Sequence, residues 1–450
     1  SEAVQAPLLD KTAVRRIALD HSICPYYLAQ DLARWADVIV GDYNYYFDMH
    51  ALLHALSEAE QWRVGVLVDE AHNLVERARG MYSAELDQHA LRALCKSAPA
   101  ALKKDLERLQ RRWSELGRSG VDEESSRYRI LPEAPAAFCR ALQQALAAIG
   151  AFYAEEPAHA DAALQSFYLD ALHFWSLLES FGDHSLFDLT RSDGTRAGSV
   201  IGIRNVMPAP FLARRFAAAA TCTLFSATLS PWHFYGDILG LPADTVWVEV
   251  ESPFDAKQLD VRVARTISTR YADRARSLPA IVELMAQTYA ERPGNYLAFF
   301  SSFDYLDQAC TAFRQRHPEV QVWEQGRRMN EAAREEFLAG FVEGGRGIGF
   351  AVLGGAFAEG IDLPGERLVG AFIATLGLPQ VNPFNEEVKT RLEAAFGAGY
   401  DYTYLFPGLR KVVQAAGRVI RTPEDRGIVV LMDERYAQGK VKRLLPGWWQ

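Results

Sequence analysis

Apolar residues follow one another without interruption in some parts of the chain and recur at helical spacing in others. Residues 62–70, WRVGVLVDE, form a short, continuously apolar, β-branched run that ends in two acids. Such a run is typical of a buried parallel strand, and open α/β sheets bind their ligands at the carboxyl ends of these strands. Residues 83–190 are instead rich in Ala, Leu and Arg at helical spacing, so we expect a helical insertion there.

Strand-like runs resume after this expected insertion. SVIGIRNV and ATCTLFSATL come first, and a boundary that contains Pro and Phe follows at Glu251–Phe254. Beyond the boundary, four more candidates for buried strands alternate with helical stretches: NYLAFFSS, GIGFAVLGG, RLVGAFIA and RGIVVLMD. This alternation predicts a second parallel α/β domain.

Length and composition indicate a globular protein with several domains. The 450 residues exceed one ordinary core, and 49% of them are hydrophobic. The formal charge of −9 argues against bulk attraction to nucleic acid but is compatible with a local basic groove. The five cysteines are dispersed without a C-x-x-C pair, which favours a reducing compartment. Because no apolar run reaches the roughly 18 residues that span a bilayer, we expect a cytoplasmic protein.

Two acids directly follow the first strand, in the tetrapeptide Asp69-Glu70-Ala71-His72. ATP hydrolysis needs one carboxylate that holds Mg²⁺, usually through water, and a second group that orients and deprotonates the attacking water. Asp69 and Glu70 fit these roles. A helix N-cap or a solvated rim also accounts for two acids after a strand, and the tetrapeptide alone does not decide between these interpretations.

A second polar group lies in the segment QAAGRVIR at residues 414–421. We expect this segment to be helical, which would place Gln414, Arg418 and Arg421 on one face. A planar guanidinium presented in this way neutralises charge that develops on a γ-phosphate, and such groups accelerate phosphoryl transfer by roughly 10³ to 10⁵. The alternative interpretation is a basic surface helix.

Three further stretches come at the ends of predicted strands. They are Ser226-Ala227-Thr228, residues 299–302 (FFSS) and residues 354–362 (GGAFAEGID). Small hydroxyl residues and glycines at strand ends let backbone N–H groups approach phosphates closely. Each stretch taken alone is better described as an ordinary turn.

In this order, the five stretches resemble motifs II to VI of the superfamily 2 helicases. The sequence is similar in particular to the DinG/XPD branch of iron–sulfur DNA helicases, through Asp-Glu-Ala-His, Ser-Ala-Thr-Leu-Ser-Pro, Glu-Gly-Ile-Asp and Gln-x-x-Gly-Arg-x-Ile-Arg. The sequence Cys24-Pro25-Tyr26-Tyr27 and the helical insertion also match that branch.

The resemblance implies an α/β fold with two RecA-like parallel-sheet motor domains and an Arch-like helical insertion in the first. Residues 1–82 and 191–250 would form the first motor domain, residues 83–190 the insertion, and residues 251–450 the second motor domain.

The resemblance also implies roles for the motif residues in an ATP-dependent DNA helicase. Asp69 would hold Mg²⁺, Glu70 would be the general base, and His72 would couple the nucleotide state to the next motif. Gln414, Arg418 and Arg421 would reach the γ-phosphate from the second motor domain. The other residues that the resemblance assigns are the coupling residues Ser226, Ala227 and Thr228, the cofactor-binding residues Glu359, Gly360 and Asp362, and the cluster ligand Cys24.

By the same resemblance, the expected cofactors are ATP and Mg²⁺, with a 4Fe–4S cluster in the intact protein but not in this chain. The expected partners are single-stranded DNA and DNA junctions, and no membrane is involved. We expect a monomer that moves 5′ to 3′, acts in DNA repair, and is associated with the nucleoid if the protein is bacterial.

The sequence departs from the family pattern at the phosphate-binding loop. No G-x-x-x-x-G-K-[ST] occurs, and only Cys24 matches one of the four cysteines that a cubane cluster needs. We therefore expect an N-terminally truncated chain that binds nucleotide poorly and is inactive alone. The alternatives are a non-catalytic scaffold that binds nucleic acid or a protein through a motor fold, and an RNA-directed motor.

Two surface features have more than one interpretation. The aromatic cluster at residues 43–47 would stack on bases or pack in a domain core. The basic face of one helix in the insertion would contact a displaced strand or form a solvated surface laced with acids; its residues are Lys103, Lys104, Arg108, Arg111 and Arg112.

Overall fold

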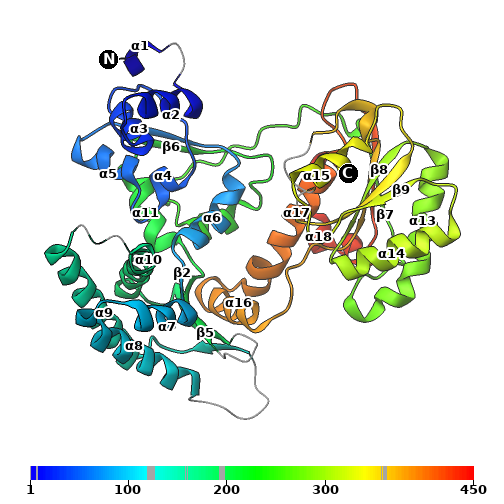
Figure 1. The fold of residues 1–450 in the computed structure, drawn as a ribbon. Helices are drawn as coiled ribbons and strands as arrows, with labels where there is room; N and C mark the ends of the chain where they lie inside the picture. Colours follow the sequence, from blue (N-terminus) through cyan, green and yellow to red (C-terminus); the bar gives the residue numbers. More distant parts are fainter. Residues whose placement is uncertain are drawn as a thin grey trace. The chain divides into compact units, whose positions relative to one another are not determined.

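The chain folds into two compact units. The computed structural model describes residues 2–6, 9–118, 127–157, 159, 161–191, 198–355, 357 and 362–449. Unit 1 consists of residues 1–229 and 235–245, and unit 2 of residues 230–234 and 246–450 (Figure 1). Among the helices that the structure describes, none combines the length and apolar character that a membrane crossing requires.

Unit 1 contains a parallel strand pair, an antiparallel sheet and several helices. Its elements are α1 (Glu2–Gln5), α2 (Lys11–Asp20), α3 (Pro25–Ala33), α4 (Asn44–Phe47), α5 (Leu52–Ala59), β1 (Gly65–Val68), α6 (Leu74–Met81), β2 (Ala84–Asp87), α7 (Gln88–Ser97), α8 (Ala100–Arg118), β3 (Tyr128–Leu131), α9 (Ala136–Glu155), α10 (Ala162–Glu179), β4 (Ser185–Arg191), β5 (Ser199–Asn205), α11 (Ala209–Ala218) and β6 (Thr221–Leu224). Helix α12 (Trp232–Leu239) has residues in both units.

The predicted strand at residues 62–70 is confirmed as β1, which pairs in parallel with β6. The prediction that this strand is buried is wrong, because Val68 is its one buried residue and Leu67 is 77% exposed. The run ATCTLFSATL supplies β6, as predicted. Strand β1 places Val68 opposite Leu224, so the residues that follow both strands lie at the same end of the pair.

The segment expected to be wholly helical is a mixed α/β structure. Helices α7 to α10 form as expected, but β2, β5, β4 and β3 pair in that order as an antiparallel sheet. The predicted strand SVIGIRNV is confirmed as β5, and it pairs antiparallel with β2 and β4. Three of these strands were missed because two have only four residues and β4 carries a buried polar residue, Asp188. The domain boundaries remain a prediction.

The basic face of α8 contains ion pairs along the helix. Arg108 Nη1 lies 3.0 Å from Asp105 Oδ1, and Arg112 Nη1 lies 2.8 Å from Glu115 Oε2. These pairs favour the interpretation as a solvated helix face laced with acids.

Unit 2 is built on a parallel sheet of six strands in the order β7-β12-β11-β8-β10-β9. Its elements are β7 (Leu259–Val263), α13 (Arg274–Glu291), β8 (Asn295–Phe300), α14 (Phe303–Arg316), β9 (Val322–Glu324), α15 (Glu331–Ala339), β10 (Gly347–Val352), β11 (Gly370–Ala374), α16 (Pro383–Phe396), the π-helical turn η5 (Asp401–Leu405), α17 (Phe406–Ala416), β12 (Gly427–Leu431) and α18 (Gly439–Lys442). The predicted strands β8, β10, β11 and β12 are confirmed, while β7 and β9 were not predicted.

The core of unit 2 lies between the sheet and helices α13 and α14. Alternate residues of β8, such as Tyr296, Ala298 and Phe300, face these helices together with Phe350 and Phe372 of the neighbouring strands. Figure 1 shows α13 and α14 on one side of the sheet. Since all six strands run in parallel, the loops after their carboxyl ends share one edge.

A fully buried carboxylate holds the loops after β7 and β12 together. Asp433 Oδ2 accepts from Thr269 N–H at 2.9 Å, and Asp433 Oδ1 accepts from Arg435 Nε at 2.7 Å. Burial by itself raises the pKa of Asp433, but the hydrogen bonds from Arg435 and Thr269 outweigh burial and hold that pKa below its ordinary value.

Substitution Asp433→Asn should lower the free energy of unfolding of unit 2 by about 3 kcal/mol, because it leaves the Arg435 guanidinium without its buried partner. A depressed folded-state pKa contributes stability above the unfolded pKa of about 3.9, and this contribution is lost as the pH falls through the folded value. Urea denaturation followed by circular dichroism should therefore show a constant difference above about pH 5 that shrinks below about pH 4. Asp260→Asn, in an exposed ion pair, is the control and should cost under about 1 kcal/mol.

Candidate functional site

The candidate site in unit 1 forms where β1 and β6 end. The acidic loop, defined as residues 69–72, follows β1, and residues 225–228 follow β6. Phe225 N–H donates to Val68 O at 3.0 Å, and Ala71 N–H donates back to Phe225 O at 3.1 Å. These bonds extend the pairing of β1 with β6 by one residue on each side. The acidic loop and Ser226 therefore lie next to each other, as we expect for residues that follow two paired parallel strands.

Glu70, His72 and Ser226 form a hydrogen-bonded triangle. His72 is buried, and its Nδ1 lies 2.6 Å from Ser226 Oγ and 3.2 Å from Glu70 Oε2. Ser226 Oγ donates to Glu70 Oε2 at 3.3 Å and accepts from Thr228 N–H at 3.2 Å. One proton assignment satisfies all these contacts: Nδ1–H of His72 and N–H of Thr228 donate to Ser226, whose hydroxyl donates to Glu70.

The backbone of the acidic loop is held in a strained conformation. Glu70 has φ of 46°, in the left-handed region that non-glycine residues rarely adopt. The Tyr43 hydroxyl donates to the carbonyl oxygens of Asp69 and Glu70, the latter at 3.0 Å. Glu70 N–H donates to Asp69 Oδ1 at 2.7 Å, and Asn73 N–H to Glu70 O at 2.9 Å. Strain of this kind persists where surrounding contacts define the conformation, and it is concentrated at functional sites.

Sequence reasoning missed this role of Tyr43. Burial raises the pKa of its hydroxyl, and the nearby charges of Glu70 and Asp69 raise it further, so the group stays protonated as a donor. Elsewhere in the aromatic cluster, Phe47 is buried against Phe216 and the Tyr46 hydroxyl donates to Arg215 O at 3.2 Å, as in the core-packing interpretation. No local pattern in the sequence indicates the contact, because Tyr43 lies 26 positions before Asp69.

The carboxylates of the acidic loop are exposed, which suits a Mg²⁺ ion held through water. Asp69 Oδ1 accepts from Glu70 N–H, and the residue is exposed to solvent. Mg²⁺ keeps several waters and usually takes one or two carboxylates beside substrate phosphates. Asp69 therefore fits the ion as a single protein ligand.

Cys24 does not fit an iron–sulfur cluster with the residues described. It is exposed and precedes α3, and within the described residues no group of three or more His, Cys, Asp or Glu side chains is placed to hold a metal ion. A cubane cluster needs four thiolates.

In unit 2, the prediction that Gln414, Arg418 and Arg421 share one helix face is wrong. Helix α17 ends at Ala416, so Gln414 lies in its last turn and both arginines lie beyond it. Gly417 N–H closes the helix on Val413 O at 2.9 Å. Val419 and Ile420, which follow the helix, are both buried. If the helix continued, these two side chains could not both be buried before the chain enters β12.

The loop that carries Arg421 is organised by Asp425. Asp425 Oδ2 accepts from the N–H groups of Arg421 at 2.6 Å and Thr422 at 2.8 Å. Burial raises the pKa of Asp425, but these bonds outweigh burial and lower it overall. Arg421 Nε lies 3.4 Å from Asp362 Oδ1, so a predicted cofactor-binding residue contacts a predicted γ-phosphate residue. The predicted residues Glu359 and Gly360 lie outside the described part of the chain.

The stretch FFSS ends β8 and begins α14. Ser302 is the N-cap of α14, and its Oγ accepts from Tyr305 N–H at 3.3 Å. Gly354 after β10 has φ of 79°, which glycine adopts at little cost. The described parts of these two stretches therefore form ordinary caps and turns at the carboxyl edge of the sheet.

Comparison with known proteins places both ends of the chain in helicase families. A model described as DEAD_2 matches residues 2–91, and one described as helicase C-terminal domain matches residues 285–450. Both matches, together with the relatives and solved structures that the chain resembles, support a DinG/XPD-like helicase of superfamily 2. The fold of the chain is that of solved helicases of this group: an XPD helicase (TM-score 0.62, 17% identity) covers 96% of the chain, which spans 76% of that structure.

Curated relatives of this helicase family are longer than the chain. A probable ATP-dependent helicase of Methanocaldococcus jannaschii is 34% identical over 33% of the chain and 25% of its own length. The ATP-dependent helicase DinG of Mycobacterium tuberculosis is 28% identical over 56% of the chain and 39% of its own length. The chain therefore spans between a quarter and two fifths of these relatives.

The strained residue of the acidic loop gives a test of the backbone geometry. Glu70→Gly should be more stable than Glu70→Ala by about 1 kcal/mol, because glycine adopts positive φ without the steric cost of a Cβ. Thermal unfolding of the two variants measures the difference. The same pair of substitutions at Glu76, in helix α6, is the control, and there alanine should be the more stable by about 1 kcal/mol. The same order at both positions would contradict the assignment of strain to Glu70.

Proposed function

We propose that the natural protein is an ATP-dependent DNA helicase that moves 5′ to 3′ on single-stranded DNA and unwinds duplexes. The observation that carries the proposal is the triangle of Glu70, His72 and Ser226 at the carboxyl end of two parallel strands. The names of the relatives, which are ATP-dependent helicases and a DNA repair factor subunit, support the substrate class.

In this proposal, Glu70 is the general base. Its side chain is 61% exposed, so a water molecule can reach the carboxylate from solvent. The hydroxyl of Ser226 holds one carboxylate oxygen and leaves the other to accept a proton from that water. Mg²⁺ bound near Asp69 would neutralise charge on the phosphates.

His72, Ser226 and Thr228 would connect the state of the nucleotide to the segment after β6. Movement of the Glu70 carboxylate toward the attacking water would remove the acceptor of the Ser226 hydroxyl, and the contact between Ser226 and Thr228 N–H would then change. Gln414, Arg418 and Arg421 are assigned to the γ-phosphate on the family resemblance. Single-stranded DNA and DNA junctions are the proposed partners of a monomer.

ATP hydrolysis by this proposal needs a phosphate-binding loop, and no G-x-x-x-x-G-K-[ST] occurs in the 450 residues. The proposal therefore concerns the full-length natural protein, and the 450-residue chain alone should bind ATP weakly. A non-catalytic scaffold is the alternative, and ATP turnover separates the two.

In the full-length protein, Glu70→Gln should lower the DNA-stimulated turnover of ATP by roughly 10² to 10⁴, because the amide cannot accept the proton of the attacking water. Binding of nucleotide should stay within about twofold of wild type. A coupled assay for phosphate release measures turnover, and a fluorescent nucleotide analogue measures binding. Glu76→Gln makes the same chemical change at an exposed ion pair of helix α6 and should leave turnover unchanged.

Two results would count against the proposal in different ways. Unchanged turnover in Glu70→Gln would remove the general base from this position. Absence of any turnover in the wild-type full-length protein, with and without single-stranded DNA, would favour the scaffold.

A further inference from the structure

Residues 42–44 of unit 1 contact both the acidic loop and the helix that follows it, and we call them the bracket. The Tyr43 hydroxyl contacts the carbonyl oxygens of Asp69 and Glu70, which belong to the two peptide groups that flank the strained Cα of Glu70. Rotation of either peptide group would break one of these contacts. The bracket therefore opposes relaxation of Glu70 to a right-handed conformation, which a residue with a Cβ favours.

The other side of the bracket is attached to α6, the helix that follows the acidic loop. The Arg77 guanidinium pairs with Asp42, and its Nη2 donates to Asn44 Oδ1 at 3.2 Å. The same guanidinium lies 6.0 Å from the centre of the Tyr43 ring, at the distance of a cation–π contact. The Asn44 N–H and the Arg77 guanidinium hold the pKa of Asp42 below its ordinary value, although burial opposes them, so Asp42 stays ionised in this pair.

The residues that follow the bracket anchor it to the core of unit 1. Phe47 is buried, and the Tyr82 hydroxyl donates to its carbonyl oxygen. Arg215 Nη2 donates to Asp48 O at 2.8 Å and to Met49 O at 3.1 Å. Tyr43 therefore reaches the acidic loop from a backbone that is itself held in place.

We propose that Tyr43 and Arg77 are positioning residues for the general base Glu70. The inference rests on the proposed function, because it concerns the step in which Glu70 accepts a proton from the attacking water. Tyr43 keeps the backbone of Glu70 in the left-handed conformation, in which its carboxylate lies 3.3 Å from Ser226 Oγ. Arg77 acts through Tyr43, because it holds the ring of Tyr43 and the neighbouring carboxylate of Asp42.

A positioning role has a kinetic consequence that differs from that of a binding role. A general base works only when its oxygen lies within hydrogen-bonding reach of the proton that it accepts. A misplacement of about 1 Å can cost 10²-fold in rate, even when the group that moves lies outside the reacting atoms. Loss of the bracket should therefore lower kcat and leave the binding of nucleotide unchanged.

In the full-length natural protein, Tyr43→Phe should lower the kcat of DNA-stimulated ATP turnover roughly 10-fold. The KM for ATP and the affinity for a fluorescent nucleotide analogue should stay within about twofold of wild type. Tyr46→Phe is the matched control, because it removes a hydroxyl that donates to a backbone carbonyl, Arg215 O, from the same segment. This control should cost similar thermal stability and leave kcat within about twofold. Equal decreases of kcat in the two variants would overturn the proposal, since lost stability would then account for both.

A second background separates positioning of the base from a general loss of structure. In Glu70→Gln there is no base to position, so adding Tyr43→Phe should lower the residual turnover by less than about twofold. Release of radiolabelled phosphate measures this slow turnover. A 10-fold decrease in this background as well would show that Tyr43 does not act through Glu70.

The part assigned to Arg77 has its own variants. Arg77→Gln should lower kcat about threefold, a smaller effect because its ion pair with Asp42 is about half exposed. In a Tyr43→Phe background it should have no further effect, since Arg77 acts through that residue. Arg34→Gln, at an exposed ion pair with Glu60 in the same unit, is the control and should leave kcat unchanged. A threefold decrease from Arg77→Gln in both backgrounds would overturn this part.

Hydrogen exchange of the 450-residue chain tests the bracket without ATP. The amides of Ala71 and Asn73 in wild type donate to backbone carbonyls, which protects them from exchange. Tyr43→Phe should speed the exchange of this peptide about 5-fold by mass spectrometry, whereas Tyr46→Phe should leave it unchanged. Unchanged exchange in Tyr43→Phe would overturn the bracket whether or not the natural protein hydrolyses ATP. Absence of turnover in the wild-type full-length protein would contradict the proposed function instead, so the two failures are distinguishable.

Discussion

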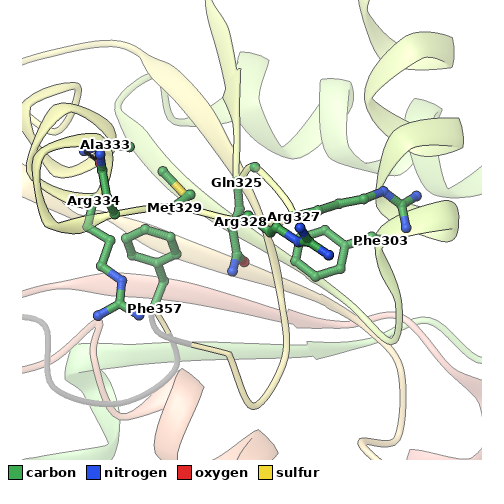
Figure 2. A pocket seen from close by; sticks show the side chains of 10 residues that line it. Phe303, Gln325, Arg327, Arg328, Met329, Ala333, Arg334 and Phe357 are labelled. Carbon is green, nitrogen blue, oxygen red and sulfur yellow. Dashed lines mark hydrogen bonds between the residues drawn. The ribbon is translucent and has the colours of Figure 1, made fainter. Parts of the chain in front are cut away.

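Parallel pairing of strands is the constraint on which every site in this protein depends. Parallel strands all end at one edge of a sheet, so segments that are far apart in the sequence meet there. In unit 1, the pairing of Val68 with Leu224 brings the acidic loop to Ser226, which lies 154 positions from His72. In unit 2, the same rule brings the loops after β8, β9 and β10 together, and a pocket of about 840 Å³ whose lining includes three arginines lies among them (Figure 2).

Two kinds of polar group matter for the site and its support: buried groups with hydrogen-bond partners, and exposed carboxylates that a ligand can reach. Asp433 is buried and accepts hydrogen bonds on both carboxylate oxygens, and buried His72 contacts Ser226 and Glu70. Asp69 and Glu70, by contrast, stand in solvent at the end of β1. Backbone hydrogen bonds define the position of these two residues, while their carboxylates remain accessible to a ligand. Such an arrangement is typical of a functional site rather than of a group that stabilises the fold.

The ends of helices decide how the arginines of unit 2 are presented. Helix α17 ends before Arg418 because the side chains of Val419 and Ile420, which come just before β12, are buried in the core. Arg421 is consequently carried by a loop that Asp425 organises. At the opposite end of a helix, the cap of α15 by Asn330 confines the loop that carries Arg328. Hydrogen bonds within these loops and at the helix cap thus fix the backbone from which these side chains extend.

The sequence by itself determined the strands whose apolar runs are continuous, the placement of Asp69 and Glu70 after one of them, and the family. In unit 2, strands β8, β10, β11 and β12 are buried almost throughout, and burial on both faces leaves such apolar runs little choice of structure. It did not determine the antiparallel sheet, because its short strands share no clear period, or the end of α17, because packing of Val419 overrides the local helical pattern. Only the tertiary structure decided that Tyr43 supports the acidic loop and that Arg328 and Arg334 line one pocket, because contacts between distant residues depend on how strands pair, which no local pattern encodes.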